Sequence, residues 1–129
     1  MALLAAMADL ARPARVLQLR AVHVDHGLHP ESARWAARAR EVCGKLGTPC
    51  TVERVHVDTR PGVSIEASAR TARYATFART LAADEILLTA HHVDDQLETV
   101  LLQLARGAGV AGLAAMPANA PFAAGRHVR

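Results

Sequence analysis

Short apolar segments typical of buried strands alternate along this chain with longer segments that have the residue spacing of helices. The expected strands cover residues 16–24, 51–57 and 85–90, and the expected helices cover residues 2–11, 30–46, 64–83 and 94–106. Strand–helix alternation favours right-handed crossovers, which give a parallel sheet with helices on both faces. The sequence therefore predicts a three-layer α/β/α fold, with 16–24 and 86–90 as neighbouring strands near the sheet centre because both are densely apolar.

The composition fits one folded domain without a membrane anchor. Hydrophobic residues make up 51% of the 129 residues, and the 28 alanines predict packing by helices with small side chains. No apolar run approaches the roughly 18–20 residues of a membrane span. The apolar start, residues 1–10, lacks the basic leader of a signal peptide, so we expect a cytoplasmic protein.

The charge of the chain leaves two interpretations open. The net charge is +3, the pI is near 9.5, and 14 of the 15 basic residues are arginine. Arginine suits bidentate phosphate contacts, which favours an anionic partner. An Ala- and Arg-rich chain is also what GC-rich coding sequence produces. Cys43 and Cys50 do not form a C-x-x-C pair, so neither a zinc ribbon nor a redox motif is indicated.

A polar cluster follows the last expected strand and opens the last expected helix. Its ionisable members are His91, His92, Asp94, Asp95 and Glu98. On a helix, His91 and Asp95 are four residues apart, and Asp95 and Glu98 are three apart, so each pair shares a face. Carboxylates in a first helical turn also simply complement the helix dipole. Five ionisable groups in eight residues exceed that need and predict a site for a metal or a substrate amine.

Further candidates lie elsewhere, each with a structural alternative. His23, Asp25 and His26 end the first expected strand, where loop polarity is the alternative. Arg70 and Arg73 share a helix face and suit phosphate, and a solvated face with local ion pairs is the alternative. Arg106 and Gly107 close the last helix near the same strand ends, or form a plain helix C-terminus. Trp35 and Tyr74 are expected in the core.

Three stretches, taken together, identify a family resemblance. They are VHVDHGL at 22–28 with Glu31-Ser32, IEASARTARY at 65–74, and TAHHVDDQLET at 89–99 with LLQLARGAG at 101–109 and Gly112-Leu113. In this order and at these separations they resemble the tRNA(Ile)-lysidine synthase family of N-type ATP pyrophosphatases, in the PP-loop superfamily. The resemblance covers most of the chain and implies an adenine nucleotide alpha hydrolase-like fold.

The family pattern begins with a strand and a Ser-Gly-Gly-x-Asp-Ser loop that cradles ATP phosphates, and neither is found here. Residues 1–4 align with what directly follows that loop, and residues 125–129 resemble the start of a strand that the family continues. We therefore expect residues 1–129 to be part of an N-terminal catalytic domain and to be inactive alone.

The resemblance implies an ATP- and Mg²⁺-dependent ligase. Such an enzyme adenylates the 2-carbonyl oxygen of the wobble cytidine in a tRNA(Ile) with a CAU anticodon. The ε-amine of L-lysine then attacks C2 and displaces AMP. The implied catalytic residues are Asp95, Glu98, His91 and Arg70, and the implied metal ligands are Asp94 and Asp95. The implied nucleotide-binding residues are His23, Asp25, His26, Arg73, Arg106 and Gly107. A homodimer is also expected.

Three other functions remain open. Another PP-loop tRNA-modifying enzyme, such as a thiolase, would share the fold, but Cys43 and Cys50 do not sit at thiolase motif positions. A metal-dependent hydrolase built on His91, Asp94, Asp95 and Glu98 would bind zinc or manganese without ATP. The third is a non-catalytic remnant that binds only tRNA or a partner protein.

Overall fold

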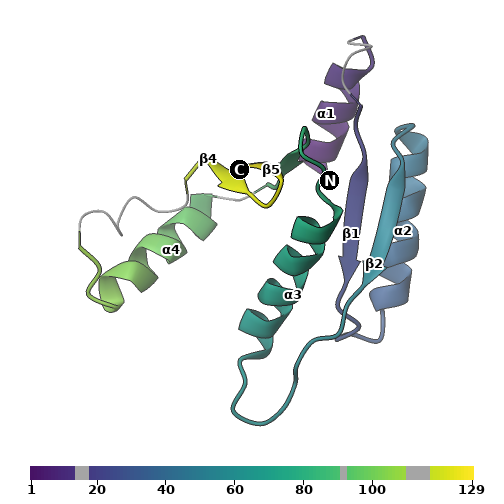
Figure 1. Cartoon of the computed structure of the whole chain (residues 1–129). Helices are drawn as coiled ribbons and strands as arrows, with labels where there is room; N and C mark the ends of the chain where they lie inside the picture. Colours follow the sequence, from purple (N-terminus) through teal and green to yellow (C-terminus); the bar gives the residue numbers. More distant parts are fainter. Residues whose placement is uncertain (14–17, 91–92, 110–116) are drawn as a thin grey trace. The chain divides into compact units, whose positions relative to one another are not determined.

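The computed structural model describes residues 1–13, 18–90, 93–109 and 117–129, the side chain of Val93 excepted (Figure 1). The chain divides into two compact units, Met1–Thr80 and Leu81–Arg129, and each is described by itself. No helix within the described residues is both long enough and apolar enough to cross a membrane.

The first unit is built on two parallel strands. Its elements are α1 (Ala2–Ala11), β1 (Ala21–Asp25), α2 (Ser32–Lys45), β2 (Cys50–Arg54) and α3 (Ile65–Thr80). Strand β1 pairs with β2 in parallel register from Ala21↔Cys50 to Asp25↔Arg54. Helix α2 packs on both strands and α3 packs on β1, as Figure 1 shows. The register brings the carboxyl ends of β1 and β2 to the same edge.

Small side chains form the core of the first unit, as the alanine content predicts. Its buried apolar residues are Ala8, Ala36, Ala39, Cys43, Val57 and Ala69. Thr76 is fully buried on α3, and its hydroxyl donates to the Ala72 carbonyl over 3.0 Å. Alanines on the inner helix faces let the helix backbones lie close to the strands, so the packing needs few large residues.

The helix ends follow local chemistry that the sequence predicts. Ser64 begins α3, and its Oγ accepts a hydrogen bond from the Ala67 N–H over 3.3 Å. Helix α2 ends before Gly47, which has φ +66°, a conformation that glycine adopts without the steric cost of a Cβ. The predicted helices 30–46 and 64–83 are therefore confirmed in place, with α3 ending at Thr80.

The second unit contains β3 (Ile86–Leu88), α4 (Val93–Ala105), β4 (Asn119–Phe122) and β5 (Gly125–Val128). Its sheet has the order β3-β5-β4, with β3 parallel to β5 and β4 antiparallel to β5. His127 is 1% exposed, and its Nε2 lies 2.8 Å from Oγ1 of Thr89. This contact ties the residue after β3 to the middle of β5.

One expectation about the strands needs correction. Strand β1 begins at Ala21 rather than 16, since residues 18–20 are not in a strand and 14–17 lie outside the described residues. The hydrogen-bonded partner of β1 within the first unit is β2, and that of β3 within the second unit is β5. Since β1 and β3 belong to different units, their expected neighbourhood stays a prediction. The tail holds the hairpin β4–β5, whose Ala-Ala turn carries no glycine or asparagine signal.

Candidate functional site

The loop after β1 presents polar groups at the carboxyl edge of the first sheet. The N–H of Gly27 donates to Oδ1 of Asp25 over 2.9 Å, and Gly27 has φ +63°. This turn needs glycine because L side chains avoid positive φ. It fixes the Asp25 carboxylate against its own loop and projects His26 next to it. Ligands of parallel α/β sheets bind at this edge.

His26 is joined to α3 by Arg73. The Nε–H of Arg73 donates to Nε2 of His26 over 3.4 Å, so the imidazole carries its proton on Nδ1. Burial lowers the pKa of His26 below 6.5, the Arg73 charge lowers it further, and Asp25 opposes both. Nδ1 is buried and has no hydrogen-bond partner among the described residues. A buried donor without a partner is unusual, and it marks this imidazole as a candidate site residue.

Arg54 is a site residue that reasoning from the sequence missed. It ends β2 directly beside Asp25, and its guanidinium lies 3.7 Å from where a Cβ on Gly27 would stand. The signal was its position at a strand end, because carboxyl ends of neighbouring parallel strands share an edge. Arg54 and Arg73 together give this edge two positive charges beside a histidine, which suits a phosphate-bearing ligand.

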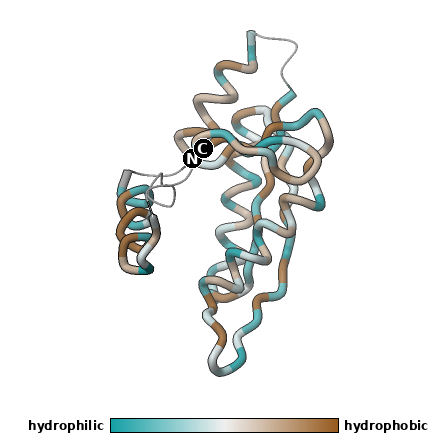
Figure 2. Tube along the Cα trace, turned by 60° about the vertical axis from the view of Figure 1, so that its left-hand side comes forward, coloured by the Kyte–Doolittle hydropathy of each residue, from teal (hydrophilic) through white to brown (hydrophobic). Residues whose placement is uncertain are grey.

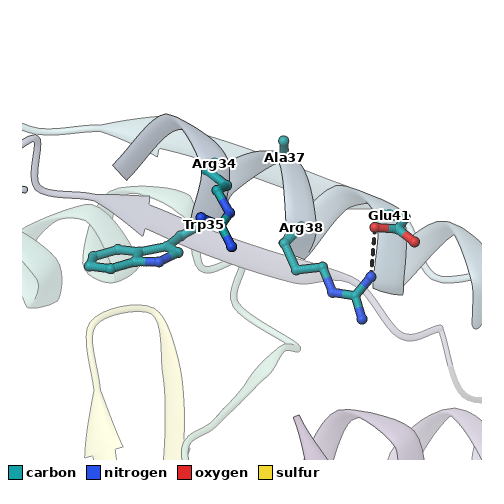
Figure 3. Close-up of a pocket in the computed structure, with 5 residues that line it drawn as sticks. All are labelled: Arg34, Trp35, Ala37, Arg38 and Glu41. Atoms are coloured by element: carbon teal, nitrogen blue, oxygen red, sulfur yellow. Dashed lines mark hydrogen bonds and ion pairs between the residues drawn. The ribbon is translucent and has the colours of Figure 1, made fainter. Parts of the chain in front are cut away.

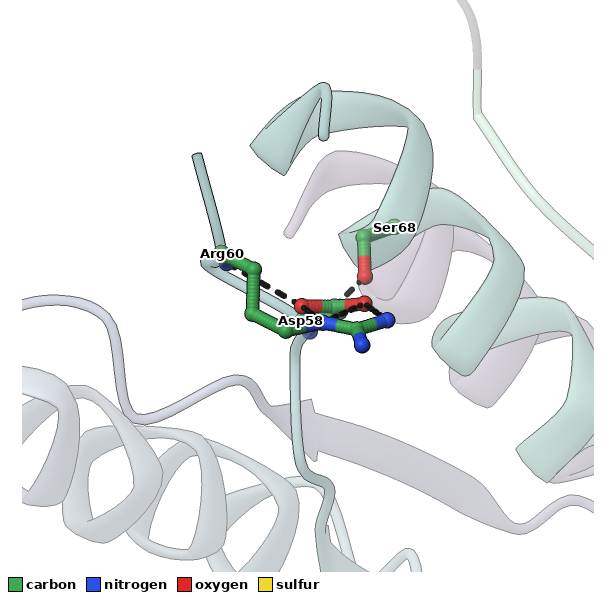
Figure 4. A network of polar contacts seen from close by, with 3 residues as sticks. All are labelled: Asp58, Arg60 and Ser68. Atoms are coloured by element: carbon green, nitrogen blue, oxygen red, sulfur yellow. Dashed lines mark hydrogen bonds and ion pairs between the residues drawn. The ribbon is translucent and has the colours of Figure 1, made fainter. Parts of the chain in front are cut away.

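Polar contacts at both ends hold α3 against the sheet. Arg60 binds the Asp58 carboxylate through Nε at 2.9 Å and a terminal nitrogen at 2.6 Å, as Figure 4 shows. The N–H of Asp58 donates to Oγ of Ser68 over 2.9 Å. At the other end, Arg79 pairs with Glu53 over 3.0 Å. These contacts fix the helix that carries Arg73.

Arg70, one turn before Arg73, stays exposed, and its guanidinium lies 5.0 Å from the Tyr74 ring centroid. Tyr74 is half-buried and meets Phe77 edge-on. The expectation that Trp35 packs in the core is wrong, since Trp35 is 49% exposed on α2. The buried face of α2 is lined instead by Ala36, Ala39 and Cys43.

The acidic residues of the second unit lie at the start of α4. Asp94 and Asp95 are in its first turn, with Asp94 exposed and Asp95 half-buried, and Glu98 follows one turn later. Thr99 Oγ1 donates to the Asp95 carbonyl over 2.8 Å. The predicted sharing of a helix face by Asp95 and Glu98 is confirmed by the helix.

Arg106 and Gly107 are not near those carboxylates, which corrects the expectation that they lie at the same strand ends. They follow α4 at its other end, about 16 Å along the helix axis from Asp95. Gly107 has φ +70° and its N–H donates to the Leu104 carbonyl. In the structure these residues end the helix.

The possible metal ligands and nucleophiles of the chain are described only in part. His91 and His92 lie outside the described residues. Within the part of the chain that is described, no three His, Cys, Asp or Glu side chains come close enough to hold a metal ion. Burial raises the pKa of the Cys43 thiol to about 11, with Cys50 adding to the effect, so Cys43 is a neutral thiol rather than a nucleophile at pH 7.

Comparison with known proteins defines the class. A family model described as a PP-loop domain matches residues 1–129, and the chain belongs to this family. Proteins named tRNA(Ile)-lysidine synthase are similar to it. The one from Coxiella burnetii is 52% identical over 112 residues, 87% of this chain and 25% of its own length. The one from Pseudomonas aeruginosa is 50% identical over 127 residues, 98% of this chain and 28% of its own.

A third relative, from Serratia proteamaculans, is 56% identical over 103 residues, which are 80% of this chain and 23% of its own length. The chain therefore spans about a quarter of the length of these relatives. The α/β fold with a parallel sheet and the resemblance to the lysidine synthases are both confirmed.

Proposed function

We propose that this chain supplies part of the catalytic domain of a tRNA(Ile)-lysidine synthase. The observation that carries the proposal is identity of 50% over nearly the whole chain to a relative of that name. In the proposed reaction, ATP adenylates the 2-carbonyl oxygen of the wobble cytidine of tRNA(Ile) with a CAU anticodon. Pyrophosphate leaves, and the ε-amine of L-lysine then displaces AMP, so a C–N bond forms.

The nucleotide-binding role is proposed for the edge formed by β1, β2 and α3. His23, Asp25 and His26 border the adenosine, and the unpaired buried Nδ1 of His26 is a donor of the kind a nucleotide ring nitrogen accepts. Arg73 faces a phosphate, and Arg54 is added to this set because it lies beside Gly27. Arg70 is proposed to contact nucleotide or tRNA phosphate, since it is exposed on the same helix.

The acceptor role is proposed for the start of α4. Asp95 and Glu98 hold the incoming lysine ammonium, and a catalytic role is also proposed for His91. A carboxylate beside the ammonium orients the amine and accepts a proton from it, so that the neutral amine can attack. Arg106 and Gly107 lie too far from Asp95 to contact the same lysine. We therefore propose them only as nucleotide contacts.

Magnesium fits the described residues only in part. Asp94 and Asp95 are oxygen donors of the type that Mg²⁺ prefers, but they do not form a three-ligand cluster with other described residues. When bound, the ion would neutralise charge that develops at the α-phosphate, and Asp94 and Asp95 are the residues that would hold it. The partners proposed with this function are tRNA(Ile), L-lysine and a second copy of the enzyme, in the cytoplasm.

A segment exchange tests the proposal. In the Pseudomonas aeruginosa relative, the matched segment is replaced by this chain, which it resembles over 127 residues. We expect the chimera to join radiolabelled lysine to tRNA(Ile) in the presence of ATP and to release AMP and pyrophosphate in equal amounts. The parent relative is the positive control, and tRNA(Ile) with the wobble cytidine replaced by uridine is the negative control. A folded chimera without lysine incorporation contradicts the proposal.

A further inference from the structure

The only tryptophan of the chain is exposed and already forms a stack. Trp35 is 49% exposed, and its ring centroid lies 4.7 Å from that of His29 with 20° between the ring planes. A tryptophan side chain stabilises a fold most when it is buried, because its apolar area is large. Here the rings form a platform on the surface, immediately after the loop that carries Asp25 and His26.

Hydrogen bonds within residues 29–32 hold this platform in one conformation. The N–H of Glu31 donates to Nδ1 of His29 over 3.1 Å, which fixes the ring. The hydroxyl of Ser32 donates to the His29 carbonyl over 2.7 Å and accepts from the His29 N–H over 3.3 Å. Since the rings are ordered before any ligand arrives, little conformational entropy is lost when a third ring stacks.

Arginines flank the platform on the outer face of α2. This helix carries four basic side chains against one carboxylate, that of Glu41. Arg34, Trp35, Ala37, Arg38 and Glu41 line a hollow of about 490 Å³, shown in Figure 3. Arg34 pairs with Glu31 at 2.6 Å and Arg38 with Glu41 at 2.7 Å, but the guanidinium side chains are 77% and 62% exposed. Exposed pairs of this kind are weak and exchange readily for another anion.

We infer that the outer face of α2, formed by His29, Arg34, Trp35 and Arg38, is a docking surface for single-stranded RNA. An unpaired base stacks on Trp35, and the flanking phosphates bind Arg34 and Arg38. The inference rests on the proposed function for the source of the RNA, the tRNA substrate. It adds a surface outside the nucleotide edge, one loop away from Asp25 along the chain.

The chemistry of the face favours RNA over a protein or membrane partner. A membrane anchor needs several aliphatic groups beside the aromatic ring, and the core of a protein interface is depleted in charged residues overall. The hollow offers only Ala37 as an aliphatic side chain. Its other lining residues are Trp35, Glu41 and two arginines, whose guanidinium groups suit RNA phosphates.

The single tryptophan makes the test direct. The chain is titrated with a single-stranded RNA oligonucleotide containing CAU, with the same sequence as a duplex for comparison, and Trp35 fluorescence is followed. We expect saturable quenching by the single strand and weaker quenching by the duplex. Affinity measured in parallel with dye-labelled RNA should fall steeply as salt is raised. A change in Trp35 fluorescence on protein dilution without RNA assigns the face to a second copy and overturns the inference.

Variants separate stacking from general charge. Trp35→Ala should weaken binding of labelled RNA about 5- to 150-fold, and Trp35→Phe should restore much of it. Arg34→Gln and Arg38→Gln should each lower the slope of log affinity against log salt by about 0.7. Glu41→Gln should strengthen binding, because it releases Arg38 and Lys45 from their shared carboxylate. The matched control is Arg12→Gln, which removes an equally exposed arginine paired with Asp9 on α1 and should change neither quantity detectably.

The outcomes distinguish this inference from the proposed function. Equal affinity in wild type, Trp35→Ala and Arg12→Gln overturns the docking surface, while a chimera that forms lysidine leaves the proposed function intact. Trp35-dependent RNA binding together with an inactive chimera retains the surface and contradicts the proposed function. Absence of RNA binding by the wild-type chain also overturns the surface. Circular dichroism of each variant checks that its helices are intact.

Discussion

Arg73 on α3 reaches His26 after β1, with 3.4 Å between Nε of the arginine and Nε2 of the histidine. The two residues are 47 positions apart, and the contact joins a helix to the carboxyl edge of the sheet. Burial lowers the pKa of His26, and the guanidinium lowers it further because it disfavours the imidazolium. The buried Nδ1–H is left without a hydrogen-bond partner among the described residues.

Replacement of Arg73 should change the titration of His26. In Arg73→Gln one of the two main causes of the lowered pKa is gone, so the pKa of His26 should rise, although burial should still hold it below 6.5. NMR titration of the His26 ring protons measures this directly. The control is Arg70→Gln, on the same helix but stacked on Tyr74 instead of His26. Identical His26 pKa values in both variants would show that the contact has no electrostatic effect.

The same pKa predicts how stability responds to pH. Because the pKa of His26 is lower in the folded chain than its ordinary 6.5, the unfolded chain binds more protons below pH 6.5. The contribution of His26 is therefore complete above pH 6.5 and is lost as the pH falls toward the folded pKa. Urea unfolding at pH 7 and pH 5 should show a smaller loss of stability for His26→Asn than for wild type. The lowered pKa values of Asp58 and Glu41 act at lower pH, outside this window.

Gly125 should be the least replaceable glycine of the second unit. A Cβ there would lie 2.2 Å from the Glu85 carbonyl oxygen and 3.1 Å from a methyl of Leu81. Since backbone must move to admit a methyl group, Gly125→Ala should cost about 2 kcal/mol or more and loosen the β3–β5 pairing. Faster hydrogen exchange at His127 and Val128 would report it.

The matched control is Gly44→Ala on α2. A Cβ at Gly44 meets nothing within 4 Å, and alanine is the better helix former. This change should stabilise the chain by about 0.5–1 kcal/mol. If hydrogen exchange at His127 and Val128 is as slow in Gly125→Ala as in the control, the turn before β5 admits the methyl group without a loss of stability, and the prediction is wrong.

Local patterns in the sequence predicted the helices because residue spacing and capping act over a few residues. The alternation of strands and helices predicted a parallel sheet. The Ser64 cap and the glycines after α2 and α4 lie within one turn of the helix ends they define. The β4–β5 hairpin could not be predicted in this way. Its turn places Ala123 at φ 49°, a conformation favoured by glycine or asparagine, so the sequence gives no turn signal.

The candidate site was predictable in its strand-end residues and less so in its partners. His23 and Asp25 lie in β1 and His26 directly follows it, and for Asp25 and His26 that order predicts a position at the carboxyl edge of the sheet. The roles of Arg54 and Arg73 depend on the pairing of β1 with β2 and on which side of α3 faces the loop. Those relationships are long-range. The exposure of Trp35 also depends on long-range packing. Helical spacing alone does not predict that alanines, rather than the tryptophan, fill the buried face of α2.

Residues 1–129 alone should bind ATP weakly. These residues contain no Ser-Gly-Gly-x-Asp-Ser loop, whose backbone N–H groups would hold the phosphates. Calorimetry should give affinity no better than the high-micromolar range, and the chimera should bind more tightly. The His26→Asn variant is the control for the residual binding, which should be lost in it. Low-micromolar affinity for residues 1–129 would show that Arg54 and Arg73 hold phosphates without the loop.

Asp95→Asn in the chimera tests the acidic start of α4. The change keeps the size of the side chain and removes its charge. If Asp95 holds the lysine ammonium or a metal ion, loss of a charged partner in a desolvated site costs about 2–4 kcal/mol, so turnover should fall about 30- to 1,000-fold. Folding should hardly change, because asparagine is well tolerated at a helix N-terminus.

If Asp95 only complements the helix dipole, stability should fall by less than about 1 kcal/mol and turnover should stay near normal. Asp84→Asn removes an exposed carboxylate before β3 and should alter neither quantity. Melting temperature and lysine incorporation, measured on both variants, separate the two roles, and near-normal incorporation in Asp95→Asn would leave Glu98 as the carboxylate that holds the lysine.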